Sequence, residues 1–487
     1  MRKILYFCFS ITLFCGLASI GTNNPEKQLK DFSVFKDGIY TKEGRIDLHH
    51  SKTEFDKHIN ALEKRLRVEQ SVLNQFKLYS STLAKIECGH TQIHPTKSVL
   101  KEWLSTRNSL PIDFYLMNDR LVVGKLHSED KKIIFLGKSE YEKKKEIPEG
   151  SEILSIDEKT IPQIMEGISQ FLSSDEDHIA FKYYQASQMF DFYRHLSEPF
   201  AKDSIEVIYI HRKDTNTIFL QTGTAPVHSM NERLGKSAEK YEQEEEEFGK
   251  FTISRKCGYF RFTSFKNSHG KKYNEFLEKS FKKMKSRKIK KMIVDVRGNT
   301  GGAMQYAFLS YVVGPDVDLG RYVVEKPKQG VENVHFKKLH SDYRKHRRMS
   351  NAQKRLKRKG KFNDGMIKTE KVDPELIFDG EIVVITDFGT FSSGSMIACH
   401  LKTLANAKIV GHTPGGSFYK GNAGTLILKL PKSGLKLFIN PNTFYSQLPP
   451  TIDHIAIKTP DVKLNNLILD EKKRDAYYFK QAIKAFR

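Results

Sequence analysis

The hydrophobic pattern of the first part of the chain predicts helices. Between residues 56 and 87, apolar residues recur at helical spacing, and the segment contains neither proline nor glycine. The pattern ends at CGHTQIHP, residues 88–95, where Gly89 and Pro95 interrupt it. Residues 25–105 are therefore expected to form a mainly helical N-terminal region.

A strand-rich pattern follows over residues 106–225. The segments 110–126 and 131–137 have the composition of strands, and the run ILSID at 153–157 precedes a turn and an amphipathic helix over 161–172. The order of glycine, acid, short strand, turn and helix resembles a PDZ domain, a module that captures extended peptides at a sheet edge. A plain α/β packing domain is the alternative.

Strands and helices alternate over residues 251–470, which predicts a layered α/β core with parallel strand pairing. Two of its strands end in glycine-rich turns, DVRGNTGG at 295–302 and GTFSSGSM at 389–396. In such sheets the carboxyl ends of the strands share one edge, where ligands bind. The two turns are therefore expected to face the same edge. Strands are expected at 257–265, 291–295, 380–387 and 407–412, and helices at 271–290, 303–313 and 396–405.

The N-terminus differs from the rest of this 487-residue chain. Arg2 and Lys3 precede a short apolar run that ends in small residues, which is the pattern of a secretory signal over residues 1–21. Cys15 follows Leu13 and Phe14 rather than small residues, so it matches a lipoprotein signal poorly. We expect export to the periplasm or cell envelope, with lipid anchoring and membrane association through the N-terminus as alternatives.

The formal net charge of +23 is distributed unevenly. Between Lys337 and Lys361, twelve lysines and arginines accompany one acid, Asp342, and few aromatic residues interleave them. This composition favours a solvated basic insertion, placed at about 326–372, over a nucleic-acid site. An acidic run at 242–248 marks a linker over 226–250, and a C-terminal helix is expected at 471–487.

The cysteines predict neither a disulfide framework nor a metal site from their spacing. Two of the five lie in the signal segment, and Cys88, Cys257 and Cys399 are isolated from one another. Cys399 lies in an apolar helical run, where a buried thiol is the simplest interpretation. No metal and no cofactor are expected.

The turn DVRGNTGG has the properties of an anion cradle. Its glycines allow backbone geometry that side chains forbid, and successive N–H groups at a strand-to-helix turn bind anions. A phosphate loop would place a lysine after the last glycine, and Gly302 is followed by alanine. An acyl oxyanion needs only two amides, so Gly301 and Gly302 are candidates for an oxyanion hole. A tight turn without a ligand is the alternative.

The turn GTFSSGSM holds serines at the start of a helix. A serine there has an exposed hydroxyl, with the helix N-terminus and free amides beside it, which favours nucleophilic attack on a carbonyl. Helix capping by serine is the competing interpretation. Taken alone, the turn does not decide between a cap and a nucleophile.

Together the two turns resemble those of the C-terminal (tail-specific) processing peptidases. IVDVRGNTGG is similar to the first motif of that family, and TFSSGSMIACHLKTLANAKIVG aligns without a gap to the second if Ser392 is the nucleophile. The resemblance implies a crotonase-like α/β peptidase core, a preceding PDZ-like domain, and Ser393 as a further oxyanion donor. PNTFYSQLPPTIDHIAIKTPDV resembles the closing segment of the family.

The sequence departs from the family at the expected base. Members with a Ser-Lys pair have a lysine shortly after the VG strand, but Ser417 stands in that region, and Lys420 lies three residues on. Residues 88–91, CGHT, resemble a motif of the tricorn protease core and retinoid-binding-protein modules. That resemblance implies His90 as the base, with Asp453 as the assisting acid. Lys420 is the alternative base, and His94 and His412 are weaker candidates.

The sequence thus predicts an exported serine endopeptidase that acts on unfolded or tail-presented proteins. A catalytically inactive binding module for a hydrophobic ligand or peptide is the alternative. A crotonase-type acyl-thioester enzyme and an envelope- or nucleic-acid-binding protein are further alternatives. The expected partner is a protein or peptide substrate, no specific nucleic acid is expected, and the sequence does not determine an oligomeric state.

Overall fold

The computed structural model describes residues 24–105, 114–117, 120–123, 147–148, 150–198, 204–221, 248–266, 270–324, 365–424, 426–447, 454–465, 468 and 470–486. The expected signal segment, the strand at 131–137, the acidic run before residue 248 and the basic run Lys337–Lys361 lie outside these residues. Among the described helices, none combines the length and the apolar character that crossing a bilayer requires.

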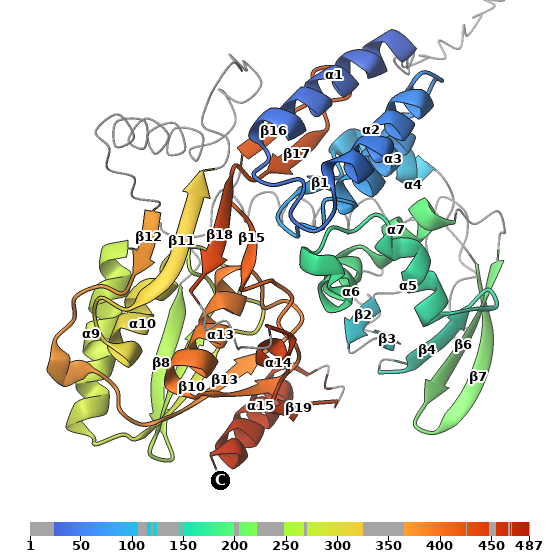
Figure 1. Cartoon of the computed structure of the whole chain (residues 1–487). Helices are drawn as coiled ribbons and strands as arrows, with labels where there is room; N and C mark the ends of the chain where they lie inside the picture. The colour runs from blue at the N-terminus through green and yellow to red at the C-terminus, as the bar shows by residue number, and fades with distance from the viewer. Residues whose placement is uncertain are drawn as a thin grey trace, which may run out of the picture.

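A six-stranded sheet forms the centre of the core, with the order β19-β14-β13-β10-β9-β8 (Figure 1). The five strands β19, β14, β13, β10 and β9 run parallel to one another, and β8 pairs antiparallel with β9. The predicted parallel α/β core is therefore present. The strands are β8 (Gly249–Ser254), β9 (Cys257–Phe262), β10 (Lys291–Asp295), β13 (Glu381–Thr386), β14 (Lys408–Gly411) and β19 (Val462–Lys463).

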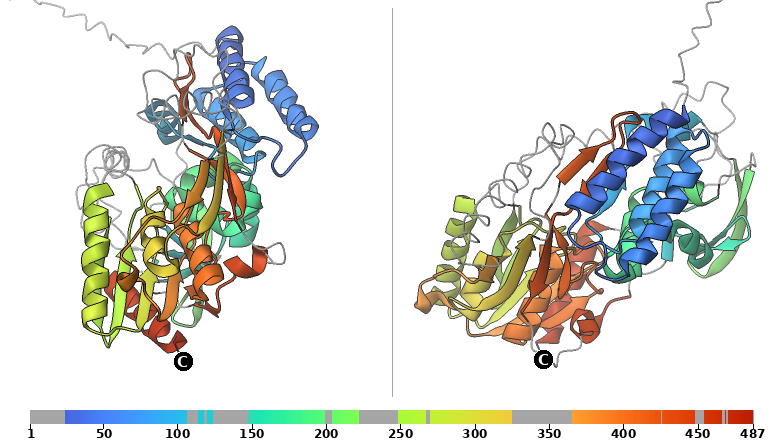
Figure 2. Two further views of the ribbon diagram at one scale, coloured as in Figure 1. Left: turned by 60° about the vertical axis from the view of Figure 1, so that its left-hand side comes forward. Right: turned by 45° about the horizontal axis from the view of Figure 1, so that its top comes forward.

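Helices cover both faces of this sheet (Figure 2). In β10, Met292 and Val294 pack with residues of α9 (Gly270–Ser286), α10 (Gln305–Val313) and α13 (Ser393–Ala405). Ile293, which points to the opposite face, packs with α15 (Glu471–Ala485). Because successive side chains of a strand alternate between faces, a strand buried on both sides is apolar throughout.

A second, antiparallel sheet stands beside the core in the order β12-β11-β18-β15. Its β12 falls within the segment 326–372 that the sequence analysis assigns to the basic insertion. Similarly, β8 begins inside the expected linker 226–250. The strands are β11 (Asp318–Val324), β12 (Gly365–Lys368), β15 (Lys420–Ala423) and β18 (Asn442–Ser446).

The N-terminal region contains four helices that share one hydrophobic core with a hairpin from the C-terminal half, β16 (Leu426–Lys429) and β17 (Lys436–Ile439). Strand β1 (Gln92–His94) pairs antiparallel with β17, which ties the region to the hairpin (Figure 1). The helices are α1 (Pro25–Lys42), α2 (Lys52–Leu66), α3 (Val72–Ala84) and α4 (Lys97–Ser105).

The helical pattern at 56–87 is divided between two helices. The chain leaves the helix after Leu66, and α3 starts where the Ser71 hydroxyl accepts a hydrogen bond from the Asn74 amide at 3.1 Å. A serine cap satisfies one of the amides that a helix start leaves unpaired. Periodicity alone did not reveal this break, because the apolar spacing continues through it.

A third sheet, of order β2-β3-β4-β6-β7 with β5 paired to β4, occupies the region expected to be PDZ-like. Helix α5 (Ile161–Ser169) follows β4 and β5 and begins with a capping box between Thr160 and Gln163. The strands and remaining helices are β2 (Phe114–Met117), β3 (Arg120–Val123), β4 (Glu152–Ile156), β5 (Lys159–Thr160), β6 (Ser204–His211), β7 (Asp214–Gln221), α6 (Ile179–Gln188) and α7 (Phe190–Ser197). The PDZ-like assignment stays a prediction.

A buried carboxylate fastens the N-terminal region to the rest of the molecule. Glu43, which has no exposed surface, accepts hydrogen bonds from the Thr91 hydroxyl (2.8 Å), the Asn422 side-chain amide (2.8 Å) and the Asn440 backbone amide (3.0 Å). A buried charge is tolerated when hydrogen bonds replace its hydration. These donors come from three separate segments, so the network fixes the start of β1 against β15 and β17.

We predict that Glu43→Ala destabilises the protein by at least about 2 kcal/mol, because buried donors that lose their acceptor each cost about 1–3 kcal/mol. Urea unfolding monitored by circular dichroism measures this change. Glu63→Ala is the matched control, because Glu63 makes a surface i,i+4 pair with Arg67, whose loss costs less than about 0.5 kcal/mol. Equal midpoints for the two variants would contradict the prediction.

Candidate active site

Ser392 lies at the turn between β13 and α13, where its backbone is strained. It has φ 52° and ψ −124°, a conformation that non-glycine residues rarely adopt and that costs about 1–3 kcal/mol. Its side chain makes no capping hydrogen bond to α13. A sharp strand-to-helix turn with this strain is the arrangement that presents a nucleophilic serine in other hydrolases. The geometry therefore favours an exposed nucleophile over a helix cap.

Glycines on three segments make room for this turn. A Cβ on Gly301 would lie 2.7 Å from the Ser392 Cβ, and a Cβ on Gly416 would lie 2.7 Å from the Ser392 amide nitrogen. A Cβ on Gly394 would lie 2.4 Å from the Asn299 carbonyl oxygen. Contacts this short do not occur in proteins, so the two glycine-rich turns pack directly against each other, as their positions at neighbouring strand ends predicted.

The structure brings His90 to Ser392. The His90 Nε2 atom is 2.9 Å from the Ser392 Oγ atom, although the two residues are 302 positions apart. His90 lies just before β1, whose pairing with β17 carries the histidine to the core. Its ring packs against Phe391 with a centroid distance of 4.6 Å, and Phe391 stacks in turn on Phe181 of α6 at 4.1 Å. Elements from all three parts of the chain therefore hold the ring.

The surroundings of His90 favour its neutral form. Burial lowers the pKa of the imidazole below its ordinary value of 6.5, and the nearby carboxylate of Asp175 opposes this shift only in part. A neutral imidazole that receives a hydrogen bond at Nε2 is a competent general base near pH 7. The Nδ1 atom is buried and has no hydrogen-bond partner among the described residues.

Asp175 is a buried acid that the sequence analysis did not single out. It belongs to the short helical turn η1 (Asp175–Asp177), and its two oxygens accept hydrogen bonds from the Gly89 amide (2.7 Å) and the Ser417 amide (2.8 Å). It therefore joins the loop of His90 to the loop where the family lysine was expected. The Cys88 sulfur, one His90 ring nitrogen and one Asp175 oxygen all lie within 4.8 Å of one another. No sequence signal marks Asp175, because it is remote from both loops along the chain.

The two candidate oxyanion glycines differ in their hydrogen bonding. The Gly301 amide donates to the Asn299 side chain at 2.9 Å, so it is already engaged. In the described part of the chain, the amides of Gly302 and Ser393 donate no hydrogen bond. The Ser393 hydroxyl donates to the Gly302 carbonyl at 2.6 Å, which links the two turns. Gly302 and Ser393 are therefore the better pair of donors for a developing oxyanion.

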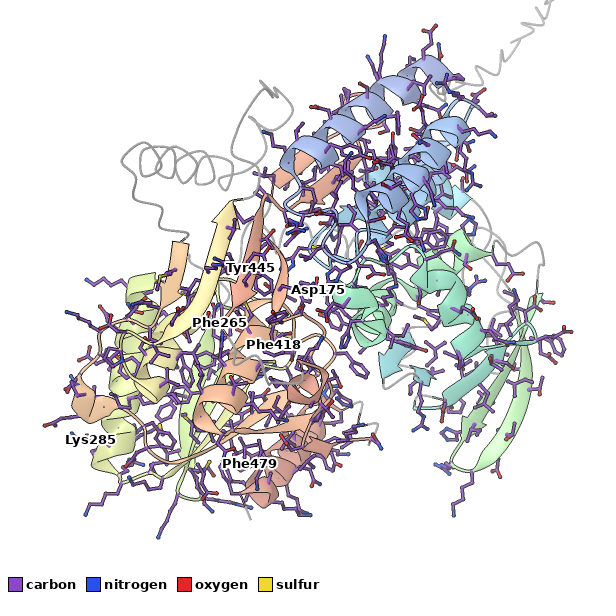
Figure 3. All side chains as sticks on the ribbon, viewed as in Figure 1. Asp175, Phe265, Lys285, Phe418, Tyr445 and Phe479 are labelled. Atoms are coloured by element: carbon purple, nitrogen blue, oxygen red, sulfur yellow. The ribbon has the colours of Figure 1, made fainter. Side chains whose placement is uncertain are left out.

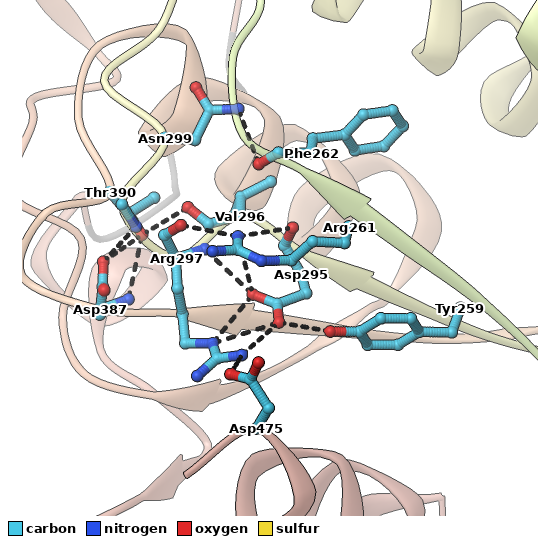
Figure 4. A network of polar contacts seen from close by, with 11 residues as sticks. Tyr259, Arg261, Phe262, Asp295, Val296, Arg297, Asn299, Asp387, Thr390 and Asp475 are labelled. Atoms are coloured by element: carbon cyan, nitrogen blue, oxygen red, sulfur yellow. Dashed lines mark hydrogen bonds and ion pairs between the residues drawn. The ribbon is translucent and has the colours of Figure 1, made fainter. Parts of the chain in front are cut away.

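An ionic network anchors the first glycine turn to the sheet and to α15 (Figure 4). The buried Asp295 carboxylate accepts hydrogen bonds from the Tyr259 hydroxyl (2.7 Å) and the Arg297 guanidinium, which also reaches Asp475 at 2.7 Å. Burial by itself raises the pKa of Asp295, but the guanidinium groups of Arg261 and Arg297 outweigh it and keep the pKa below the ordinary value. The aspartate and arginine of DVRGNTGG thus hold the turn in place.

The remaining predicted residues lie elsewhere or outside the described chain. The Lys420 ammonium donates to the Leu48 carbonyl at 3.4 Å, and it makes no hydrogen bond to Ser392. The His412 ring bonds the Tyr478 hydroxyl at 3.2 Å, and the His94 ring packs on Phe438. Asp453 lies outside the described residues, so its predicted role as the assisting acid stays a prediction.

Comparisons with known proteins agree with this geometry. The sequence model of peptidase family S41 matches residues 256–447, which span both glycine turns, and no curated protein matches the chain in sequence. A structure of mature CPAF complexed with lactacystin is 13% identical, with a TM-score of 0.58 over 94% of this chain and 98% of that chain. A structure of a CPAF mutant is 12% identical, with a TM-score of 0.59 over 94% and 96% of the two chains.

A third structure, the photosystem II D1 C-terminal processing protease, is 14% identical over 90% of this chain and 93% of that chain. Its TM-score of 0.38 is too low to support an argument. The CPAF structures support a common fold, and the family match covers the segment that carries both motifs. Over residues 256–447 the chain matches peptidase family S41, and this segment is a serine peptidase core.

Proposed function

We propose that this serine peptidase is an exported endopeptidase that hydrolyses unfolded or tail-presented proteins, with Ser392 as its nucleophile and His90 as its base. The contact of 2.9 Å between Ser392 Oγ and His90 Nε2 is the observation that carries the proposal. The strained backbone of Ser392 supports it, because strain of this kind is retained where it serves a function.

In the first step, His90 Nε2 takes the proton of the Ser392 hydroxyl as Oγ attacks the scissile carbonyl carbon. The carbonyl oxygen becomes an oxyanion, which the amides of Gly302 and Ser393 stabilise. Each such donor contributes about 3–4 kcal/mol to the stability of comparable transition states. The imidazolium then gives its proton to the leaving amine. In the second half of the reaction, His90 takes a proton from water as the water attacks the acyl carbonyl, and it then returns that proton to the Ser392 oxygen.

The carboxylate of Asp175 assists by its charge. It opposes the effect of burial on the His90 pKa, and so it stabilises the imidazolium that forms during the attack. In this arrangement His90 is the base of Ser392, so the reaction needs no lysine at the position that Ser417 occupies. The alternative of an inactive binding module rested mainly on the missing lysine, and a histidine base removes that support.

The substrate and the location rest on the sequence. The basic start and short apolar run of residues 1–21 favour export, to the periplasm or the cell envelope. The strand-rich region before the core, if it binds peptides as PDZ domains do, would hold an extended chain by strand addition. Extended chains are most available in unfolded proteins and at protein tails.

We predict that Ser392→Ala and His90→Ala each lower kcat/KM on an unfolded fluorogenic protein substrate by at least about 1,000-fold. Lys420→Met is the matched control, and it should keep activity within about threefold, because its ammonium donates to the Leu48 carbonyl and not to Ser392. Labelling by a fluorophosphonate should place the three variants in the same order as their activities do. If Lys420→Met were inactive and His90→Ala active, the assignment of the base would be wrong.

The pH dependence of the reaction follows from the lowered pKa of His90. The base must be unprotonated, and burial moves its pKa below 6.5, so the neutral form persists below that pH. We therefore expect the acidic limb of kcat/KM, measured with a chelator present, to have its midpoint below pH 6.5. An acidic limb centred above pH 7 would contradict this expectation.

Substitution of the glycines tests how the turns are packed. Gly301→Ala places a Cβ against Ser392, at a φ of +104°, so we expect loss of activity by at least about 100-fold and a lower unfolding midpoint. Gly298→Ala is the control in the same turn, because its φ of +66° is also positive but nothing lies within 4 Å of the new Cβ. The Gly298 variant should keep most of its activity.

A further inference from the structure

The group of Cys88, His90 and Asp175 has the donors of a metal site. One sulfur, one ring nitrogen and one carboxylate oxygen lie within 4.8 Å of one another. Cys88 and His90 come from one loop, while Asp175 comes from η1 and lies at the junction of the core, the N-terminal region and the third sheet (Figure 3). Such a combination of thiol, imidazole and carboxylate binds Zn²⁺ better than it binds hard cations such as Mg²⁺ or Ca²⁺.

The dimensions of the group are close to those of a tetrahedral zinc site. Bond lengths of about 2.0–2.3 Å from zinc to nitrogen, oxygen and sulfur place ligand atoms roughly 3.3–3.8 Å apart. The three donor atoms, within 4.8 Å of one another, would reach these separations by movements of about 1 Å. Three protein ligands leave a fourth position for water, as in zinc sites with an open coordination position.

The charges of the group also suit a divalent cation. With a thiolate at Cys88, a carboxylate at Asp175 and a neutral imidazole, the two positive charges of Zn²⁺ are balanced. Without a cation, burial raises the pKa of the Cys88 thiol well above its ordinary value, and the charges of Asp175 and Glu43 add to this effect. The thiol is therefore neutral at rest, and it ionises when a cation displaces its proton to solvent.

A second, independent observation is the unpaired nitrogen of the histidine. His90 Nδ1 is buried and has no hydrogen-bond partner among the described residues, although its other nitrogen contacts Ser392. A buried polar atom without a partner costs free energy that a ligand recovers. The side chain already offers one nitrogen to the nucleophile, and in the described part of the chain the other nitrogen has no partner.

We propose that Cys88, His90 and Asp175 form an inhibitory zinc site that switches off the peptidase by occupying the Nδ1 atom of its base. The inhibitory effect rests on the proposed role of His90. As a base, His90 carries its proton on Nδ1 and accepts the serine proton at Nε2. When zinc binds the Nδ1 lone pair, the proton resides on Nε2, which then cannot accept a proton from Ser392.

The burial of the three donors determines how inhibition develops. Cys88 and Asp175 are each only 2% exposed, so the ion reaches them when the loop of residues 88–91 moves away from η1. Such local opening precedes binding, and we expect inhibition by Zn²⁺ to develop over time rather than on mixing. A chelator should restore full activity, because no covalent bond of the protein changes.

Binding is tested first without reference to activity. Full-length Ser392→Ala protein titrated with Co²⁺ should develop a thiolate-to-cobalt charge-transfer band with a stoichiometry of one, and Zn²⁺ should remove the band by displacement. Adding Cys88→Ala to this protein should abolish the band. Adding Cys399→Ala instead should leave it unchanged, because Cys399 is another buried free thiol, remote from His90 in the sequence. Absence of the band in the Ser392→Ala protein would overturn the zinc site.

Inhibition is tested second, in the active protein. Cys88→Ala should keep the activity of the wild type and should need at least about tenfold more Zn²⁺ for half inhibition, since it lacks one of three ligands. The Cys399→Ala control should show the sensitivity of the wild type. Equal sensitivity of both variants would overturn the proposed switch. A cobalt band in a protein without peptidase activity would retain the metal site and reject the proposed function, so the two failures are distinguishable.

Discussion

The hydrogen bond between His90 and Ser392 depends on strand pairing between distant parts of the chain. The two residues are 302 positions apart, and only the antiparallel pairing of β1 with β17 places the loop of His90 over the end of the central sheet. The shared hydrophobic core of the N-terminal helices and the β16–β17 hairpin stabilises this pairing, and the buried Glu43 network fixes its start. The active site is thus assembled from both ends of the chain.

Around this contact, strain and tight packing work together. Ser392 adopts an unfavourable backbone conformation, which the surrounding structure must stabilise. The glycines of three segments allow the two turns to approach within contact distance, and the Asp295–Arg297 network holds one turn to the sheet and to α15. Positions that lack a side chain are therefore as important to the site as the reacting groups.

The region of the third sheet contributes to the site from outside the core, through η1 and α6. Asp175 holds the loops of His90 and Ser417 through two amides, and Phe181 stacks on Phe391 next to the His90 ring. A movement of this region relative to the core would alter the surroundings of the base directly. The same junction gathers the thiol, the imidazole and the carboxylate whose spacing along the sequence shows no metal motif.

The sequence by itself determined the alternating α/β core and the two glycine turns, because these depend on local periodicity and on motifs within short segments. It named Ser392 through the resemblance of the two turns to those of the C-terminal processing peptidases. It also named His90 through a resemblance in CGHT. Only the tertiary structure decided that Nε2 of His90 contacts Ser392 and that Asp175 lies beside the histidine. It also decided that, among the described residues, the Gly301 amide donates a hydrogen bond and the Gly302 amide does not. These facts depend on which distant segments pack together, and local sequence patterns do not encode those long-range contacts.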